Sequence, residues 1–243
     1  MKTVIVTQAR MGSSRLPGKV ALKIQGVSLL GWHLERLKHC AAADEVVVAT
    51  TVSPADEAIL KIAAEHGVRW FRGSEDDVLS RYHGAARETH ADLVVRVTSD
   101  CPLWDPVEGE NVIDLVKRNP QADLANNCEP RTFPRGLDTE AFWMDVLERM
   151  QRAAPPAPCP QREHVSEMAY GAQSGLFVKL NHAALADNSD LRWCVDTRED
   201  FSVIEKLIAG TGNPLAAYPL MLAYARAHPE IGAINAEVVQ KTV

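Results

Sequence analysis

The chain has 243 residues, of which 46% are hydrophobic and 24% are charged, a composition typical of globular proteins. Its net charge of -6 argues against a nucleic acid partner, because binding a phosphate backbone requires a basic face. No apolar run reaches the ~18 residues that a membrane-spanning helix needs, and we expect no signal peptide. The five scattered cysteines contain no C-x-x-C pair, which favours a reducing cytoplasm over a disulfide framework or a zinc site.

In the first half of the chain, short apolar runs alternate with helical patterns. Strands are predicted at 3–7, 45–49, 68–71, 92–97 and 123–125, and helices at 29–40, 55–66, 78–90 and 107–118. Such alternation predicts βαβ units with right-handed crossovers. The expected fold class is therefore α/β, with a doubly wound and mainly parallel sheet.

The second half of the chain is less regular. Strands are predicted at 137–143, 176–180 and 191–195, and helices at 162–170, 201–209 and 215–227. The segment 153–160 is predicted to be a loop, because it is rich in proline, which breaks helices. We expect a single domain over residues 1–243, with a small lobe inserted or appended near the strand ends.

The first motif, QARMGSSRLPGK at residues 8–19, directly follows the first predicted strand. Its glycines allow backbone N–H groups to approach oxygens, and its cations Arg10, Arg15 and Lys19 neutralise negative charge. The loop leaves the carboxyl end of a strand, where α/β sheets bind ligands. It is not a Walker A loop, because five residues separate its glycines and a valine follows its lysine. The motif predicts a polyphosphate site, with a solvated basic loop as the alternative.

Two aspartates come just after predicted strands. Asp100 lies in the motif TSDCP, beside the phosphate loop, where a carboxylate can hold Mg²⁺ together with phosphate oxygens and water. The alternative for Asp100 is an ordinary turn residue. Asp196 lies in LRWCVDTREDF, where Thr197 and Asp200 have the spacing of a partial capping box.

The pattern A-R-x-x-S-x-R-x-P-x-K at residues 9–19 resembles the signature of the cytidylyltransferases that activate sugar acids. The resemblance continues through VVVATTVSPADEAI, FRGSEDDVLSRY and VRVTSDCPLWDP and covers roughly residues 2–205. Within that group, the similarity points to the spore-coat polysaccharide biosynthesis cytidylyltransferases. It implies a Rossmann-like nucleotide-diphospho-sugar transferase fold, with a nucleotide-binding half at 1–130 and an acceptor-binding and closing half at 131–243. It also implies a homodimer that binds CTP, Mg²⁺ and a small acceptor.

The resemblance also assigns roles to individual residues. The implied catalytic residues are Arg10, Arg15, Lys19 and Asp100, and the implied metal ligands are Asp100 and Asp196. The implied nucleotide contacts are Ala9, Gly12, Ser13, Ser14, Thr50, Thr51, Arg72, Thr98 and Ser99. The implied acceptor contacts are Arg135, Asp138, Glu140 and His164. Thr50 and Thr51 could each equally cap the helix that begins near Pro54. The alternative for Arg72 is a surface arginine, and the alternative for His164 is a side chain that packs against a helix.

These residues support in-line attack of an acceptor oxygen on the α-phosphorus of CTP, with release of pyrophosphate and without a protein nucleophile. A sugar acid, a phosphate and a phosphonate all remain open as the acceptor. One alternative is a nucleotide-sugar-dependent glycosyltransferase of surface polysaccharide synthesis, although Asp100-Cys101-Pro102 breaks the D-x-D pattern typical of that class. A second alternative is a non-catalytic nucleotide sensor.

Overall fold

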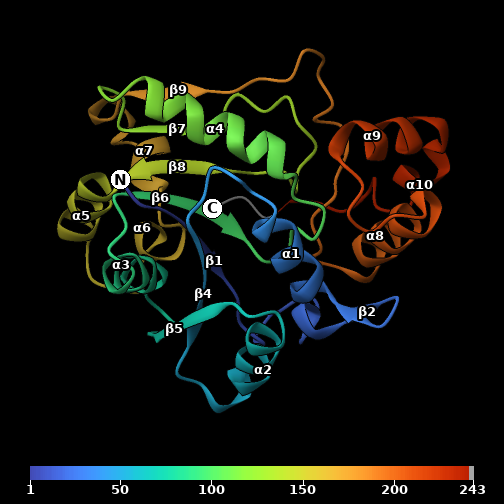
Figure 1. Cartoon of the computed structure of the whole chain (residues 1–243), viewed down its shortest axis with the longest axis horizontal. Helices are drawn as coiled ribbons and strands as arrows, with labels where there is room; N and C mark the ends of the chain where they lie inside the picture. Colours follow the sequence, from blue (N-terminus) through green and yellow to red (C-terminus); the bar gives the residue numbers. More distant parts are fainter. Residues whose placement is uncertain (241–243) are drawn as a thin grey trace.

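The computed structural model describes residues 1–240 and is built around a seven-stranded sheet in the order β5-β4-β1-β6-β8-β7-β9 (Figure 1). Strands β2 and β3 form a separate two-stranded hairpin. The strands are β1 Thr3–Gln8, β2 Lys23–Ile24, β3 Val27–Ser28, β4 Glu45–Thr51, β5 Arg69–Gly73, β6 Leu93–Thr98, β7 Leu124–Asn126, β8 Glu140–Trp143 and β9 Lys179–Asn181.

The sheet is mainly parallel, as predicted. β5, β4, β1 and β6 pair in parallel, β7 pairs in parallel with β9, and β8 runs antiparallel to both of its neighbours. Val4, Ile5 and Val6 of the central strand β1 are all completely buried. This continuous apolar run is what a strand covered on both faces requires.

Helices cover both faces of the sheet, which confirms the doubly wound arrangement. One face packs against α1, α2 and α4, and the other against α3, α5 and the short helices α6 and α7. The helices are α1 Leu29–Lys38, α2 Glu57–Glu65, α3 Val78–Glu88, α4 Pro106–Arg118, α5 Met144–Ala153, α6 Pro160–Glu163, α7 Glu167–Tyr170, α8 Arg198–Thr211, α9 Tyr218–Ala227 and α10 Pro229–Ala233, with 3-10 turns η1 Lys19–Ala21, η2 Pro54–Asp56 and η3 Ser174–Leu176.

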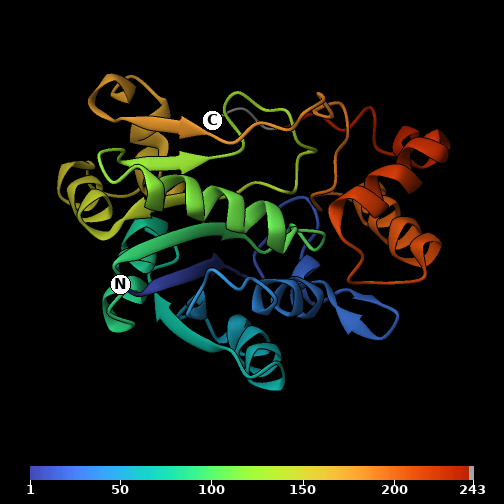
Figure 2. The same cartoon turned by 45° about the horizontal axis from the view of Figure 1, so that its top comes forward.

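The C-terminal helices α8, α9 and α10 form a lobe beside the sheet, drawn in red in Figures 1 and 2. Their shared core includes Leu207, Ile208 and Met221, and it takes in Ile24 from the β2–β3 hairpin and Trp193 from the preceding loop. The lobe is therefore tied to the segment that follows β1. None of the helices within residues 1–240 is long and apolar enough to cross a membrane.

The structure differs from the predicted elements in three places. Residues 191–195 form no strand, because their N–H groups bond to two loops: Trp193 N donates to the Arg135 carbonyl at 2.6 Å and Val195 N to the Asp100 carbonyl at 2.8 Å. The helix predicted at 162–170 is split into α6 and α7 at Val165, whose φ is 44°. The pattern analysis missed α5, although its buried apolar residues have helical spacing.

Candidate active site

A cleft of about 920 Å³ opens at the carboxyl ends of β1 and β6 and draws its walls from both halves of the chain. Most of the residues predicted for the site line it. They are Ala9, Arg10, Ser13, Ser14, Arg15, Lys19, Thr98, Ser99, Asp100, Arg135, Asp138, Glu140, His164 and Asp196. Gly12 belongs to the same loop but is exposed and does not line the cleft. The structure therefore places the basic loop, both aspartates and the four predicted acceptor contacts around one space.

The basic loop is held by buried side chains and by a hydrogen bond within its own backbone. Leu16 and Val20 are buried, and the Gly18 N–H donates to the Met11 carbonyl at 3.0 Å. Gly18 has a φ of 70°, a conformation that glycine adopts without steric cost. The loop thus has a defined path, and Arg10, with a 44% exposed side chain, remains at its open side.

Asp56, in the 3-10 turn η2 that follows β4, supports the loop, and the sequence analysis did not single it out. It is only 2% exposed, and its carboxylate accepts a hydrogen bond from Met11 N at 2.7 Å and another from the Thr51 hydroxyl. The Thr51 hydroxyl is therefore engaged within the protein, and the completely buried Thr50 does not line the cleft. The sequence pattern around Asp56 does not reveal this role, because the loop residue that it binds, Met11, is 45 positions away.

Arg72 also lies outside the cleft lining. Its guanidinium donates to the carbonyls of Thr51 at 2.9 Å and Ser53 at 3.1 Å, and it pairs with Glu57 at 2.5 Å. These contacts hold the turn between β4 and α2. The structure thus does not bring Thr50, Thr51 and Arg72 together with the other predicted nucleotide contacts.

Lys19 lies at the centre of the cleft, between the two predicted metal ligands. Its Nζ is 3.1 Å from Asp100 Oδ2, 2.9 Å from Asp196 Oδ1 and 2.7 Å from the carbonyl oxygen of Val195. Arg15 pairs with the other oxygen of Asp196, Oδ2, at 2.7 Å. Two cations of the basic loop therefore bridge to carboxylates that come from opposite halves of the chain.

The ion pairs keep Asp100 charged. Burial raises the pKa of this carboxyl, but the Lys19 ammonium and hydrogen bonds from Thr98, Lys19 and Cys101 outweigh burial and lower the pKa to about 2. Burial lowers the pKa of Lys19, but Asp100 and Asp196 reverse the effect and raise it above its ordinary value. Lys19 and Asp100 therefore face each other as a charged pair at neutral pH.

The donor set fits Mg²⁺ only in combination with a phosphate ligand. Among residues 1–240, no group of three or more His, Cys, Asp or Glu side chains could hold a metal ion. Mg²⁺ is commonly bound by one or two carboxylates, with phosphate oxygens and water completing its coordination. Asp100 and Asp196 supply hard carboxylate oxygens of this kind, and Lys19 already shows that a cation is stable between them.

His33 fixes the turn that carries Asp100. The ring is completely buried on α1, with Nδ1 2.9 Å from the Cys101 carbonyl and Nε2 3.0 Å from the Thr7 hydroxyl. Because a carbonyl only accepts, Nδ1 carries the proton and the Thr7 hydroxyl donates to Nε2. Burial lowers the pKa of His33 from 6.5 to about 4, so the ring is neutral at neutral pH.

We expect His33 to make the protein less stable in acid. The unfolded imidazole takes up a proton near pH 6.5 and the folded one only near pH 4, so the unfolded state binds more protons between these values. The free energy of unfolding should therefore fall by about 3 kcal/mol from pH 7 to pH 4 through this residue alone. Urea unfolding of the wild type and His33→Gln at both pH values measures the difference. The exposed His39→Gln should behave like the wild type, and an unchanged pH dependence in His33→Gln would contradict the assignment.

Of the four residues predicted to contact an acceptor, two are engaged in ion pairs. Asp138 forms two hydrogen bonds with Arg131, at 2.5 and 2.6 Å, and Glu140 pairs with Arg96 and accepts from the Ser166 hydroxyl at 2.7 Å. These carboxylates shape the wall of the cleft. Arg96 was missed because its partner Glu140 is 44 residues away.

Arg135 and His164 also line the cleft. Within residues 1–240, Arg135 forms no ion pair, so its guanidinium is available to an anion. His164 is partly buried, and burial lowers its pKa below the ordinary value. The charge of Arg135 also helps to lower the pKa of Asp138, so these two side chains interact electrostatically in the wall of the cleft.

The sheet, the basic loop and the paired aspartates together define a nucleotidyltransferase, and comparison with known proteins agrees. The profile of the cytidylyltransferase family matches residues 3–153. The chain is 35% identical over 225 residues to the spore coat polysaccharide biosynthesis protein SpsF of Bacillus subtilis. The alignment covers 86% of this chain and 88% of that protein. The chain thus belongs to the cytidylyltransferase family, as the motifs predicted.

Solved structures show the same relationship. A cytidylyltransferase from Leptospira borgpetersenii superimposes over the whole of both chains, with a TM-score of 0.91 and 33% identity. A CMP:2-keto-3-deoxy-manno-octonic acid synthetase complexed with CTP gives a TM-score of 0.68 at 20% identity, over 86% of this chain and 99% of the other. The second likeness shows the fold alone, and it confirms the nucleotide-diphospho-sugar transferase type of sheet.

Proposed function

We propose that this enzyme transfers CMP from CTP to a small acidic acceptor, such as a sugar acid, a phosphate or a phosphonate, in a Mg²⁺-dependent reaction that releases pyrophosphate. The observation that carries the proposal is the position of Lys19 between Asp100 and Asp196, at the base of a loop with two further cations. Three cations match a triphosphate, and two hard carboxylates match the metal that accompanies it.

The loop cations would bind the triphosphate. Arg10 is exposed at the open side of the cleft, and its single ion pair among residues 1–240 is the long one to Glu75 at 3.6 Å, so it can turn toward the β- and γ-phosphates. Arg15 and Lys19 can exchange their carboxylate partners for phosphate oxygens, which are also anionic acceptors. Their charges would then neutralise the pyrophosphate as it leaves, which lowers the barrier by stabilising charge that develops in the transition state.

Asp100 and Asp196 would hold Mg²⁺, which would supply positive charge and Lewis acidity at the α-phosphate. The Lys19 charge holds the pKa of Asp100 at about 2, and a bound Mg²⁺ would replace that charge when Lys19 turns to the phosphates, so Asp100 would hold positive charge rather than remove the acceptor's proton. Arg135, which lines the same cleft, would bind the negative group of the acceptor. The two halves of the chain would thus place the acceptor oxygen opposite the leaving pyrophosphate.

The fate of a label in the α-phosphate of CTP tests the proposal. The enzyme is incubated with labelled CTP, Mg²⁺ and a panel of sugar acids, phosphate monoesters and phosphonates. Label in a new acceptor-dependent product, with unlabelled pyrophosphate, is the expected result. A parallel incubation replaces CTP with nucleotide sugars. No labelled product with any acceptor in the first incubation, together with release of a nucleoside diphosphate in the second, would instead identify the glycosyltransferase alternative.

A further inference from the structure

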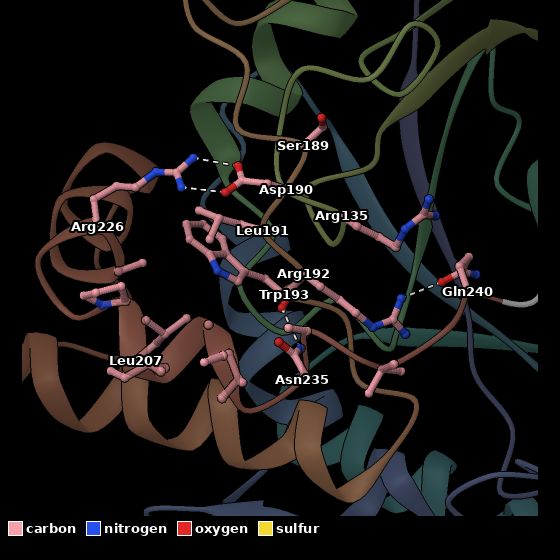
Figure 3. A pocket seen from close by; sticks show the side chains of 18 residues that line it. Arg135, Ser189, Asp190, Leu191, Arg192, Trp193, Leu207, Arg226, Asn235 and Gln240 are labelled. Carbon is pink, nitrogen blue, oxygen red and sulfur yellow. Dashed lines mark hydrogen bonds and ion pairs between the residues drawn. The ribbon is translucent and has the colours of Figure 1, made fainter.

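Arg192 bridges Asp196 to the C-terminal lobe, and neither the motifs nor the family resemblance assigns it a role. Its side chain is 10% exposed and lies in the loop between β9 and α8 (Figure 3). We propose that Arg192 is a positioning residue, which holds Asp196 so that only Oδ1 of its carboxylate faces the metal. This inference rests on the proposed role of Asp196 as a metal ligand.

The two oxygens of Asp196 have different partners. Oδ1 faces the centre of the cleft and accepts from Lys19 at 2.9 Å. Oδ2 accepts from Arg192 Nη2 at 2.8 Å and pairs with Arg15 at 2.7 Å. When Arg15 turns to a triphosphate, Arg192 remains on Oδ2. The carboxylate then keeps its orientation at the moment when the metal needs it.

Arg192 can hold this position because it is itself held on several sides. Its Nε donates to Asp200 Oδ1 at 2.9 Å, and its carbonyl accepts from Asn235 Nδ2 at 3.0 Å. Asp200 is completely buried and also accepts from the backbone N–H of Asp196 at 2.9 Å. The same carboxylate therefore fixes both the main chain of Asp196 and the guanidinium that orients its side chain.

The fixed geometry follows from the start of α8. The Thr197 hydroxyl caps this helix by accepting a hydrogen bond from the Asp200 N–H at 3.3 Å, and the Asp200 carboxylate accepts one from the Thr197 N–H at 3.0 Å, which completes a capping box. Because Asp200 is locked by the cap, it has little freedom to release Arg192. Second-layer contacts of this kind to a metal ligand typically change metal affinity or activity by about 10- to 100-fold when they are removed.

Arg226 provides a matched control. Arg192 and Arg226 both line a second pocket, beside the C-terminal lobe, where Arg226 lies on the side opposite Gln240 (Figure 3). Arg226 forms two hydrogen bonds with Asp190, both of 2.7 Å. This ion pair is separate from Asp196. Loss of Arg226 therefore removes a similar ion pair from the same lobe without touching the proposed metal ligand.

The test is the affinity for Mn²⁺ in the presence of CTP and the absence of acceptor, measured by electron paramagnetic resonance for the wild type, Arg192→Met, Arg192→Lys and Arg226→Met. We expect Arg192→Met to weaken Mn²⁺ binding by about 10- to 100-fold and to lower kcat by a similar factor, with a smaller change in KM for CTP. Arg192→Lys should recover part of the affinity, because lysine keeps the charge but cannot contact both aspartates. Arg226→Met should match the wild type.

Each outcome decides a different claim. Mn²⁺ affinity within twofold of the wild type in both Arg192→Met and Arg192→Lys would overturn the positioning role. If Arg192→Met does not fold, the comparison between Arg192→Lys and Arg226→Met decides, and equal affinities in these two would likewise overturn it. If the wild type itself binds no Mn²⁺ with CTP, the proposed metal site is wrong, and the positioning role falls with it.

Discussion

Asp100→Asn should reduce the rate of CMP transfer by on the order of 10³-fold, because a metal-ligand carboxylate contributes several kcal/mol to stabilisation of the transition state. Asparagine keeps the shape of the side chain and removes the charge that the Lys19 ammonium stabilises at 3.1 Å. Release of pyrophosphate at saturating CTP and Mg²⁺ measures the effect on kcat. We expect the far-ultraviolet circular dichroism of the variant to match that of the wild type.

Asp76→Asn is the matched control for this variant. Asp76 is exposed and does not line the cleft, so the same chemical change there should leave turnover unchanged. Wild-type turnover by Asp100→Asn would remove Asp100 from the metal site.

Lys19→Met should weaken CTP binding by about 10- to 100-fold, since hydrogen bonds to charged groups contribute about 1.5–3 kcal/mol. The substitution also leaves Asp100 and Asp196 without the cation that lies between them. Burial should then raise the pKa of Asp100, because the largest opposing influence is the Lys19 charge. The dissociation constant for CTP, measured by calorimetry with Mg²⁺ present, tests the first effect.

Lys23→Met controls for the loss of one positive charge. Lys23 lies exposed on the β2–β3 hairpin, outside the cleft, and its loss should leave CTP affinity unchanged. Equal CTP affinities for Lys19→Met and Lys23→Met would contradict the assignment of Lys19 to the nucleotide site.

The fold could be predicted where one segment alone determines an element. β1, β4 and β6 are buried apolar runs, and α1, α2, α3 and α4 carry apolar residues at helical spacing, so local patterns were sufficient. The antiparallel direction of β8 was not predicted, because it depends on which edges of β6 and β7 are free to pair. Residues 191–195 were wrongly predicted as a strand, because an apolar run does not reveal that its N–H groups bond to loops.

The site divides in the same way. The basic loop, Asp100 and Asp196 were recognisable because their motifs are contiguous in sequence. Asp56, His33 and Arg192 were not, because each acts through partners distant along the chain or through a network that only the folded lobe creates. Arg72 has the right residue type for a nucleotide contact, but three partners hold it at the turn after β4.

The most direct test of the central claim is thermal stabilisation by CTP, UTP, ATP and GTP, each with and without Mg²⁺. A ligand at 100 times its Kd stabilises the folded state by about 2.7 kcal/mol, which raises the Tm of a chain of this size by about 5–10 °C. The account predicts a rise with CTP that is larger when Mg²⁺ is present, and little or none with the other nucleotides. An equal rise with all four nucleotides, or no rise with CTP, would contradict it.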